Sequence, residues 1–204
     1  MGSVKRRLCD ESRERCHKAY GEAVRADAVR NLDAVLQTGA RLLAADPSTP
    51  IATIAAEAGV DRRTVYRRFA TREALLVALA NATLDGAEQA LDEARLTEAP
   101  VAVALHRYVE SIVSVSRRWP VDFGRLESGD AATDERRQRV RSRVDAFVDR
   151  LVAEGLLRAD LPAGWARAML DQLVSLAAHR FPGLEPPQAA DLVVDTLRKG
   201  VGTR

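Results

Sequence analysis

The sequence predicts an all-α protein, and three observations lead to that prediction. Alanine, leucine, arginine and glutamate dominate the 204 residues, and all four are strong helix formers or tolerated well in helices. Aromatic residues make up only 4% of the chain. Apolar residues recur at intervals of three and four, and no segment shows the alternation expected of a strand.

Composition limits the class of protein. Hydrophobic residues make up 47% of the chain and charged residues 29%, which is typical of a soluble globular protein. No apolar run approaches the roughly 18 residues that a membrane span needs, and the N-terminus lacks the apolar segment of a signal peptide. A cytoplasmic location is therefore expected. Cys9 and Cys16 are expected to be free thiols there, and a redox pair is the alternative.

Charge is unevenly distributed along the chain. Residues 1–70 hold 13 Lys and Arg against 9 Asp and Glu, whereas residues 71–204 hold 18 against 20. A basic N-terminal third on a slightly acidic remainder indicates an anionic partner for that third. Residues 1–23 are polar without a sustained period, so we expect a flexible basic arm there.

The first two helices are marked by apolar spacing and by proline and glycine. Residues at i, i+3 and i+4 predict a helix at about 25–45, and Pro47 ends it. Thr49 is expected to cap a short second helix that has Pro50 at its first position. Gly59 should end this helix because glycine adopts the left-handed conformation readily.

Side-chain caps mark the helices that follow. Asp61 should cap a third helix at 62–69, and Thr71 should cap a fourth that runs to about residue 94. Residues 121–132 are ambiguous between a loop and one short helix. Further helices are expected at about 100–118, 133–154, 163–180 and 186–200.

Two short helices joined by a tight turn, residues 49–69, have the spacing of a helix-turn-helix. At about 100° per residue, Val65 and Phe69 point to one side of the second helix, whereas Arg63 and Arg67 point to the other. The apolar side must pack on the first helix. Arginine both pairs with guanine in the major groove and neutralises phosphate, so the basic side predicts a DNA-binding helix.

The stretch STPIATIAAEAGVDRRTVYRRFATREALLVAL, residues 48–79, resembles the DNA-binding region of the TetR family of transcriptional repressors. That family shows a Thr-led second helix, the pattern IA..AGVS...LY.HF, and SKEALL at the start of the fourth helix. Here Asp61 replaces the usual serine, Arg68 replaces histidine or tyrosine, and Thr71-Arg72 replaces Ser-Lys. Each replacement keeps the role of a cap or of a phosphate-facing donor.

The resemblance implies two domains. Residues 24–70 would form an N-terminal three-helix helix-turn-helix DNA-binding domain, and residues 71–204 a C-terminal helical ligand-binding and dimerisation domain. The residues that it implies as DNA contacts are Thr49, Thr53, Arg62, Arg63, Thr64, Tyr66, Arg67, Arg68 and Arg72.

The resemblance also implies a pocket among the helices that follow the third, and a dimer made by the last two. Candidate pocket residues are His106, Tyr108, Glu110, Trp119, Phe123, Phe147, Asp171 and His179. Candidate dimer residues are Trp165, Met169, Leu173, Leu176, Leu192, Val193 and Thr196.

The expected function is sequence-specific binding of double-stranded DNA as a homodimer. A small, largely apolar ligand would release this repressor from a palindromic operator, and an activator or a redox-responsive regulator of the same fold is the alternative. The sequence contains no Gly-rich phosphate loop, HExxH motif, nucleophile elbow or metal-ligand cluster. We therefore expect no enzyme activity, no cofactor and no metal site. A helical adaptor for proteins is a further alternative, and the four-arginine helix argues against it.

Overall fold

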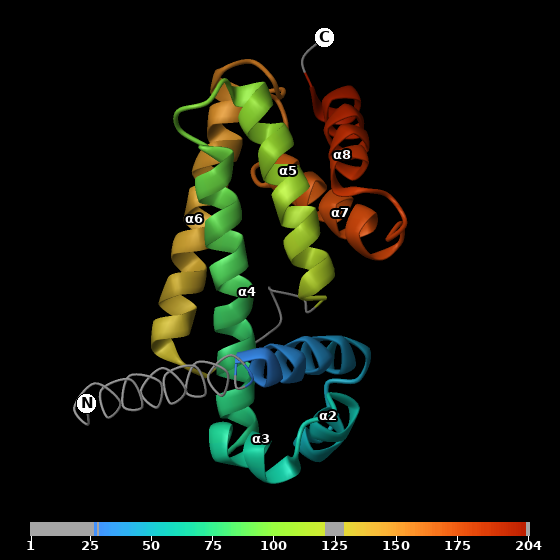
Figure 1. Ribbon diagram of the computed structural model, residues 1–204. Coiled ribbons are helices and arrows are strands. Elements are labelled where there is room, and N and C mark those ends of the chain that lie inside the picture. Colours follow the sequence, from blue (N-terminus) through green and yellow to red (C-terminus); the bar gives the residue numbers. More distant parts are fainter. Residues whose placement is uncertain (1–26, 28, 121–128, 203–204) are drawn as a thin grey trace, which may run out of the picture.

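The computed structural model describes residue 27, residues 29–120 and residues 129–202 (Figure 1). Within these ranges the chain is helical, and the bridge between Leu157 and Gly202 belongs to no named strand. The all-α prediction is confirmed. No helix in the described ranges is both long and apolar enough to cross a membrane. The helices are a first helix that includes residues 29–45, α2 (Ile51–Glu57), α3 (Arg62–Arg68), α4 (Arg72–Ala94), α5 (Val101–Arg118), α6 (Ala131–Ala153), α7 (Trp165–His179) and α8 (Pro186–Val201).

Two hydrophobic cores organise the molecule. The smaller one holds together the head, which consists of the first helix, α2 and α3, and it includes Ile54, Val65 and Phe69. The larger one holds together the body, which consists of α4 to α8. Helix α4 runs from the head through the length of the body (Figure 1). Its Leu75 and Leu79 lie in the head core, whereas later residues of the same helix lie in the body core.

The body is arranged around α4 and α5. Helix α5 packs against α4, α7 and α8, while α6 packs against α4 (Figure 1). Arg136 joins α6 to α4, because its Nε donates to Glu88 Oε1 at 2.8 Å and its Nη2 donates to Asp85 Oδ1 at 2.6 Å. The hydrogen bond from Arg136 lowers the pKa of Glu88 below its ordinary value. These contacts hold the long central helix in a fixed position relative to its neighbours.

Several helix ends lie where the sequence predicted them. The first helix ends at residue 45, before Pro47. Gly59 has a φ of 66° directly after α2, which is the left-handed conformation that favours glycine. Thr71 Oγ1 accepts a hydrogen bond from Ala74 N at 3.2 Å and caps α4. These predictions are confirmed because each depends on residues within one turn of the helix end.

Three helices start at other residues than predicted, and α7 starts at Trp165 instead of about 163. The N-cap of α2 is Pro50, not Thr49, and it makes no side-chain cap. The Thr49 hydroxyl instead donates to Asp46 O at 2.8 Å. Helix α6 starts at residue 131, two residues early, because Asp130 Oδ2 accepts from Thr133 N at 2.8 Å. The predicted arm, the two cysteines and Phe123 lie outside the described residues.

Candidate nucleic-acid interface and ligand cavity

The turn between α2 and α3 is built from local interactions. Asp61 Oδ1 accepts from Arg63 N at 2.9 Å and from Thr64 N at 3.3 Å, which satisfies two of the free N–H groups at the start of α3. Val65 and Phe69 are buried against the first helix and α2. One side of α3 is therefore anchored in the head core, and the opposite side faces outward.

Replacing Asp61 with alanine should lower the free energy of unfolding by about 1 kcal/mol, because the cap of α3 is lost. Chemical denaturation of the two proteins measures the difference. Asp61→Asn is the matched control, since asparagine also accepts a cap hydrogen bond, and it should unfold close to the wild type. Equal stability of the alanine variant and the wild type would contradict the role of Asp61 as a cap.

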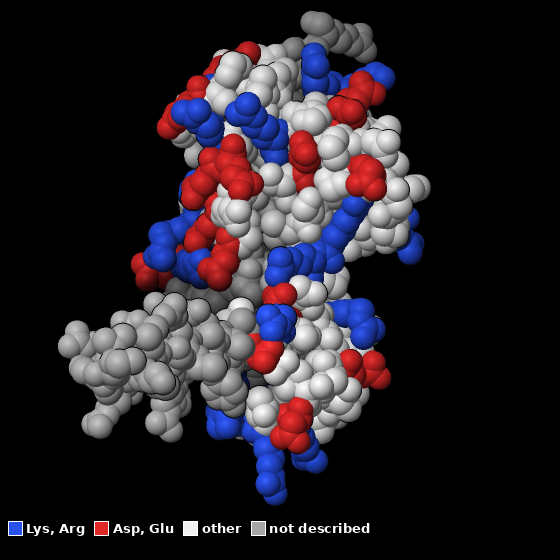
Figure 2. All heavy atoms as spheres, viewed as in Figure 1, with Lys and Arg blue, Asp and Glu red and all other residues white. Residues whose placement is uncertain are grey.

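The outward side of α3 is strongly basic. Arg62, Arg63, Arg67 and Arg68 are all exposed, and Figure 2 shows basic side chains projecting from the end of the molecule where α3 lies. Among the described residues none of the four guanidinium groups pairs with a carboxylate. The Arg62 guanidinium lies 5.2 Å from the centre of the Tyr66 ring, a cation–π contact that orients both side chains. Arg63 and Arg67 lie opposite the buried side, and Arg62 and Arg68 lie nearer its edges. Four exposed cations without a carboxylate partner are suited to bind phosphate and guanine.

Thr49, Thr64 and Arg72 are less exposed than the other predicted DNA contacts. Thr53 and Tyr66 are exposed, but Thr64 is half-buried and Thr49 is only 7% exposed. Arg72 Nη1 donates to Thr49 O at 2.6 Å, and its Nη2 donates to Pro47 O. The Arg72 guanidinium therefore holds the turn before α2 against the start of α4. No local pattern could have revealed this role, because the partners lie more than twenty residues earlier in the chain.

A cavity of about 490 Å³ lies between α4, α5, α6 and α7. It brings together Tyr108, Trp119, Asp171 and His179, four of the predicted pocket residues. The other lining residues are Thr83, Ala87, Ile112, Val115, Ser116, Pro120, Arg141, Arg167, Gln172, Val174 and Ser175. The lining is mixed, with apolar side chains on three of the helices and several polar or charged ones, and a concave site of this size can hold a small molecule.

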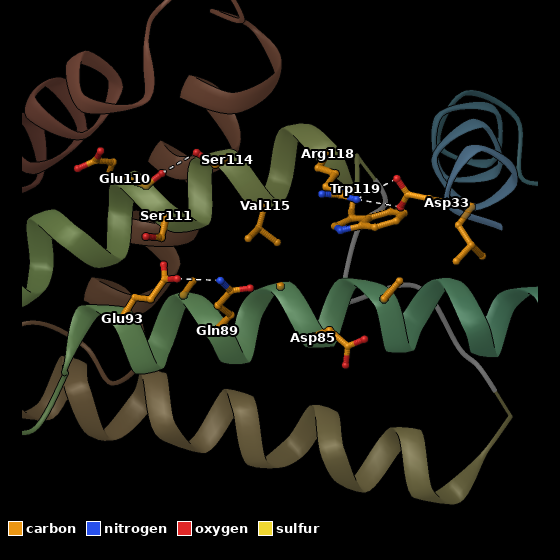
Figure 3. Close-up of a pocket in the computed structure, with 14 residues that line it drawn as sticks. Asp33, Asp85, Gln89, Glu93, Glu110, Ser111, Ser114, Val115, Arg118 and Trp119 are labelled. Atoms are coloured by element: carbon orange, nitrogen blue, oxygen red, sulfur yellow. Dashed lines mark hydrogen bonds and ion pairs between the residues drawn. The ribbon is translucent and has the colours of Figure 1, made fainter. Parts of the chain in front are cut away.

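The remaining predicted pocket residues lie elsewhere. His106 Nε2 is 2.9 Å from Asp191 Oδ1 and links α5 to α8. Phe147 is buried in the body core, with its ring 6.2 Å from that of Tyr108 in an edge-on arrangement. Glu110 borders a separate groove between the first helix, α4 and α5 (Figure 3). These three positions are on the right helices, but their side chains do not line the cavity.

Charged groups at one end of the cavity are arranged around Arg167. Its Nη1 donates to Asp145 Oδ1 at 2.7 Å, and its Nε donates to Asp171 Oδ2 at 2.9 Å. Partial burial raises the pKa of Asp171, and the charge of Arg167 opposes that rise. Burial raises the pKa of Tyr108 well above its ordinary value, so this phenol remains a hydrogen-bond donor. Partial burial and the nearby Arg117 lower the pKa of His179.

The end of α5 connects the cavity with the head. Trp119 lines the cavity and is also part of the head core, where it is 6% exposed. Arg118 Nη2 donates to both carboxylate oxygens of Asp33 in the first helix, at 2.8 and 3.0 Å. The Arg118 guanidinium lies 5.4 Å from the centre of the Trp119 ring, and Figure 3 shows the three side chains together. Trp119 and Arg118 therefore connect the cavity wall with the head.

Exposed apolar side chains gather on α7 and α8. Trp165 is 52% exposed, and Leu176, Leu192 and Thr196 also face outward. Met169 and Leu173 are half-buried. Val193 is only 3% exposed and belongs to the body core, so it is not available to a partner. Phe181, in the turn between the two helices, is exposed as well and was not among the predicted residues.

Comparison with known proteins decides the family. Residues 36–79, which cover most of the head and the start of α4, match the profile of bacterial regulatory proteins of the TetR family. The chain is 31% identical over 175 residues to the HTH-type transcriptional repressor LfrR of Mycolicibacterium smegmatis, covering 85% of this chain and 92% of that protein. The chain belongs to the TetR family. It is a transcriptional regulator with a helix-turn-helix head, and its family is one of regulators rather than of enzymes.

Solved structures of TetR-family regulators share this fold. LfrR from Mycobacterium smegmatis in complex with proflavine has a TM-score of 0.64 and 27% identity, over 86% of this chain and 98% of that one. A TetR family regulator from Marinobacter aquaeolei VT8 also has a TM-score of 0.64, at 19% identity over 88% of this chain and 100% of that one. The second comparison supports the TetR fold alone.

Proposed function

We propose that this TetR-family regulator is a repressor that binds a palindromic operator as a homodimer and is released by a small, largely apolar ligand. The main support for sequence-specific DNA binding is the set of four exposed arginines on α3, which have no carboxylate partner among the described residues. We assign DNA binding to residues 24–70, and ligand binding with dimerisation to residues 71–204. The likeness to the repressor LfrR favours repression over activation.

The homodimer is supported by the apolar surface of α7 and α8. Large apolar side chains rarely gather on the surface of a monomer without covering a partner. Trp165, Leu176 and Leu192 are exposed there, and Phe181 extends the same surface. A two-fold dimer would present two α3 helices to half-sites about one helical turn apart, which is the geometry of a palindromic operator.

Release by a ligand is supported by the part of the cavity wall that also belongs to the head core. Trp119 belongs to both, and α4 runs from the head to the cavity. A ligand that favours a cavity shape in which the two heads are wrongly spaced would weaken DNA binding, and DNA would weaken ligand binding by the same factor. The solved LfrR complex holds proflavine, which supports a small-molecule ligand for this fold.

Selection from random duplex DNA at near-physiological salt tests the proposal. We expect a palindrome with half-sites about one turn apart to be recovered. Equal binding to every duplex, with an affinity that falls as salt rises, would instead indicate a non-specific basic surface. Once the operator is known, its release from the protein provides a direct screen for ligands.

Replacing Tyr66 with phenylalanine should weaken all duplexes by a similar factor. We assign the Tyr66 hydroxyl to a phosphate, and a phosphate contact carries no sequence information. The ring and its contact with Arg62 are kept in this variant. Affinities for the operator and for single-base variants of it measure the effect. A changed order of preference among these duplexes would show that Tyr66 reads a base.

A further inference from the structure

Arg141 is exceptional among the arginines of α6. Every other arginine of this helix has a carboxylate partner, whereas the Arg141 side chain has no ion pair or hydrogen bond within the described residues. Arg141 is half-buried and lines the cavity between α4, α5, α6 and α7. The paired residues are Arg136 with Asp85 and Glu88, Arg137 with Asp134, Arg139 with Glu135, Arg143 with Asp92, and Arg150 with Glu154.

Tyr108 brings a second unmatched donor to the same cavity. Its side chain is 4% exposed, yet its hydroxyl has no hydrogen-bond partner among the described residues. Among the described residues, the Tyr108 hydroxyl is not one of the fully buried atoms that lack a partner, so it is open to the cavity and lies on its wall. The neutral phenol offers a donor to a ligand in the cavity.

Arg167 lies near both residues in the cavity wall. Its Nη1 donates to the backbone carbonyl oxygen of Arg141 at 3.4 Å, and its charge acts on the Tyr108 phenol. Arg167 is itself shared by Asp145 and Asp171. The charge of Arg167 is therefore balanced by protein carboxylates. The charge of Arg141 also acts on Asp171, but its guanidinium makes no ion pair or hydrogen bond with a described residue, so its donors remain available to a ligand.

One strip of the cavity wall on α5 is apolar or aromatic, and polar residues, among them Ser116, Gln172 and Ser175, line other parts of the wall. Tyr108, Ile112, Val115 and Trp119 lie on one face of the helix, spaced by three and four residues, and all four line the cavity. Eleven residues at a helical rise of about 1.5 Å separate the two ends by roughly 16 Å. The apolar strip thus runs from Tyr108, which offers a hydroxyl donor, to Trp119.

We propose that the ligand of this cavity is a small apolar molecule that carries one anionic oxygen group, such as a carboxylate. The Arg141 guanidinium and the Tyr108 hydroxyl hold the anionic group, and the apolar part extends along Ile112 and Val115 toward Trp119. This assignment rests on the proposed function, in which the same cavity binds the effector. A charge-assisted pair with an unshared guanidinium is stronger than a neutral hydrogen bond, and this selects an anion over an amide of equal shape.

Three naphthalene derivatives of similar size test the charge of the ligand. Calorimetric titration of the purified protein compares naphthoate, neutral naphthamide and the cation naphthylmethylammonium. We expect naphthoate to bind about 10-fold more tightly than naphthamide, and the cation to bind more weakly than either. In Trp165→Phe, Trp119 is the one tryptophan left of two, and quenching of its fluorescence by the bound ring places the ligand beside Trp119. Trp119 also borders the groove at Glu110, so weaker quenching after Arg141→Ala is what assigns the ligand to this cavity.

Variants separate the site from a general effect of charge. Arg141→Ala should weaken naphthoate about 10-fold and leave naphthamide unchanged. Arg139→Ala is the matched control, because Arg139 is on the same helix but exposed and paired with Glu135, and it should change neither affinity. Tyr108→Phe keeps the buried ring and should also weaken naphthoate selectively. Absence of naphthoate binding, equal affinity for the three compounds, or equal losses in the two arginine variants would overturn the assignment.

Calorimetry detects the ligand without DNA, so the two proposals fail separately. Naphthoate that binds in an Arg141-dependent way without releasing operator DNA would support the anion site and contradict ligand-controlled repression. Operator release by the cation alone would support repression and overturn the anion site.

Discussion

Replacing Arg63 and Arg67 together with alanine should abolish sequence-specific binding to the operator and leave the fold intact. Both side chains are exposed on the side of α3 opposite the buried Val65 and Phe69, so their loss removes no packing. One bidentate contact to a base is worth about 1–3 kcal/mol, and the pair should therefore cost at least about 30-fold in affinity. Fluorescence anisotropy of a labelled operator measures the loss, and circular dichroism verifies the fold.

The control for this experiment is a double variant with the same change in net charge. Arg139→Ala with Arg198→Ala removes two exposed arginines from α6 and α8, far along the chain from the head. Its operator affinity should change by less than threefold, because long-range charge effects are screened at physiological salt. Equal losses in both double variants would show that overall charge, and not the outward side of α3, produces binding.

Replacing Trp119 with alanine should have the largest effect on stability. Removal of a buried tryptophan typically lowers the free energy of unfolding by about 3–5 kcal/mol. Trp119 is packed in the head core and forms part of the cavity wall, so both the head and its attachment to the body should loosen. Urea denaturation measures the loss, and operator affinity should fall with it.

Trp165→Ala is the control for the Trp119 variant. Trp165 is 52% exposed in the single chain, and an exposed position of this kind costs little stability by itself. If Trp165 contacts a second copy, the stability lost in Trp165→Ala should become smaller as the protein is diluted, because dimerisation contributes stability by mass action and both proteins become monomers at low concentration. The loss in Trp119→Ala should exceed that of Trp165→Ala at low protein concentration. Wild-type stability of Trp119→Ala would contradict the position of its side chain in the head core.

Local sequence predicted the head with few errors. Asp61 and Thr71 cap their helices, and Gly59 takes the left-handed conformation, because each of these roles depends on neighbours three or fewer residues away. The opposite faces of α3 follow from the helical period in the same way. The error at Thr49 has a related cause. Its hydroxyl can form a hydrogen bond either with the start of α2 or with Asp46, and in the turn before α2 it donates to the carbonyl oxygen of Asp46.

Residues with partners far along the chain could not be placed in this way. Arg72 stays a predicted DNA contact, and the structure adds that its guanidinium binds the carbonyl groups of residues 47 and 49, which the sequence did not predict. His106 was predicted to line the pocket, but it pairs with Asp191 of α8. In both cases the sequence shows a polar side chain on the correct helix, and only helix packing determines which of several partners it meets.

The sequence alone thus determined the all-α class, most helix ends, the helix-turn-helix and the basic outward side of α3. These features depend on hydrogen bonds within a turn and on the helical period, which are interactions between near neighbours. Only the tertiary structure decided that the cavity brings Tyr108 and Arg141 together, and that Trp119 belongs to both cavity and head. Such relations depend on how four helices pack, and side chains tens of residues apart become neighbours only through that packing.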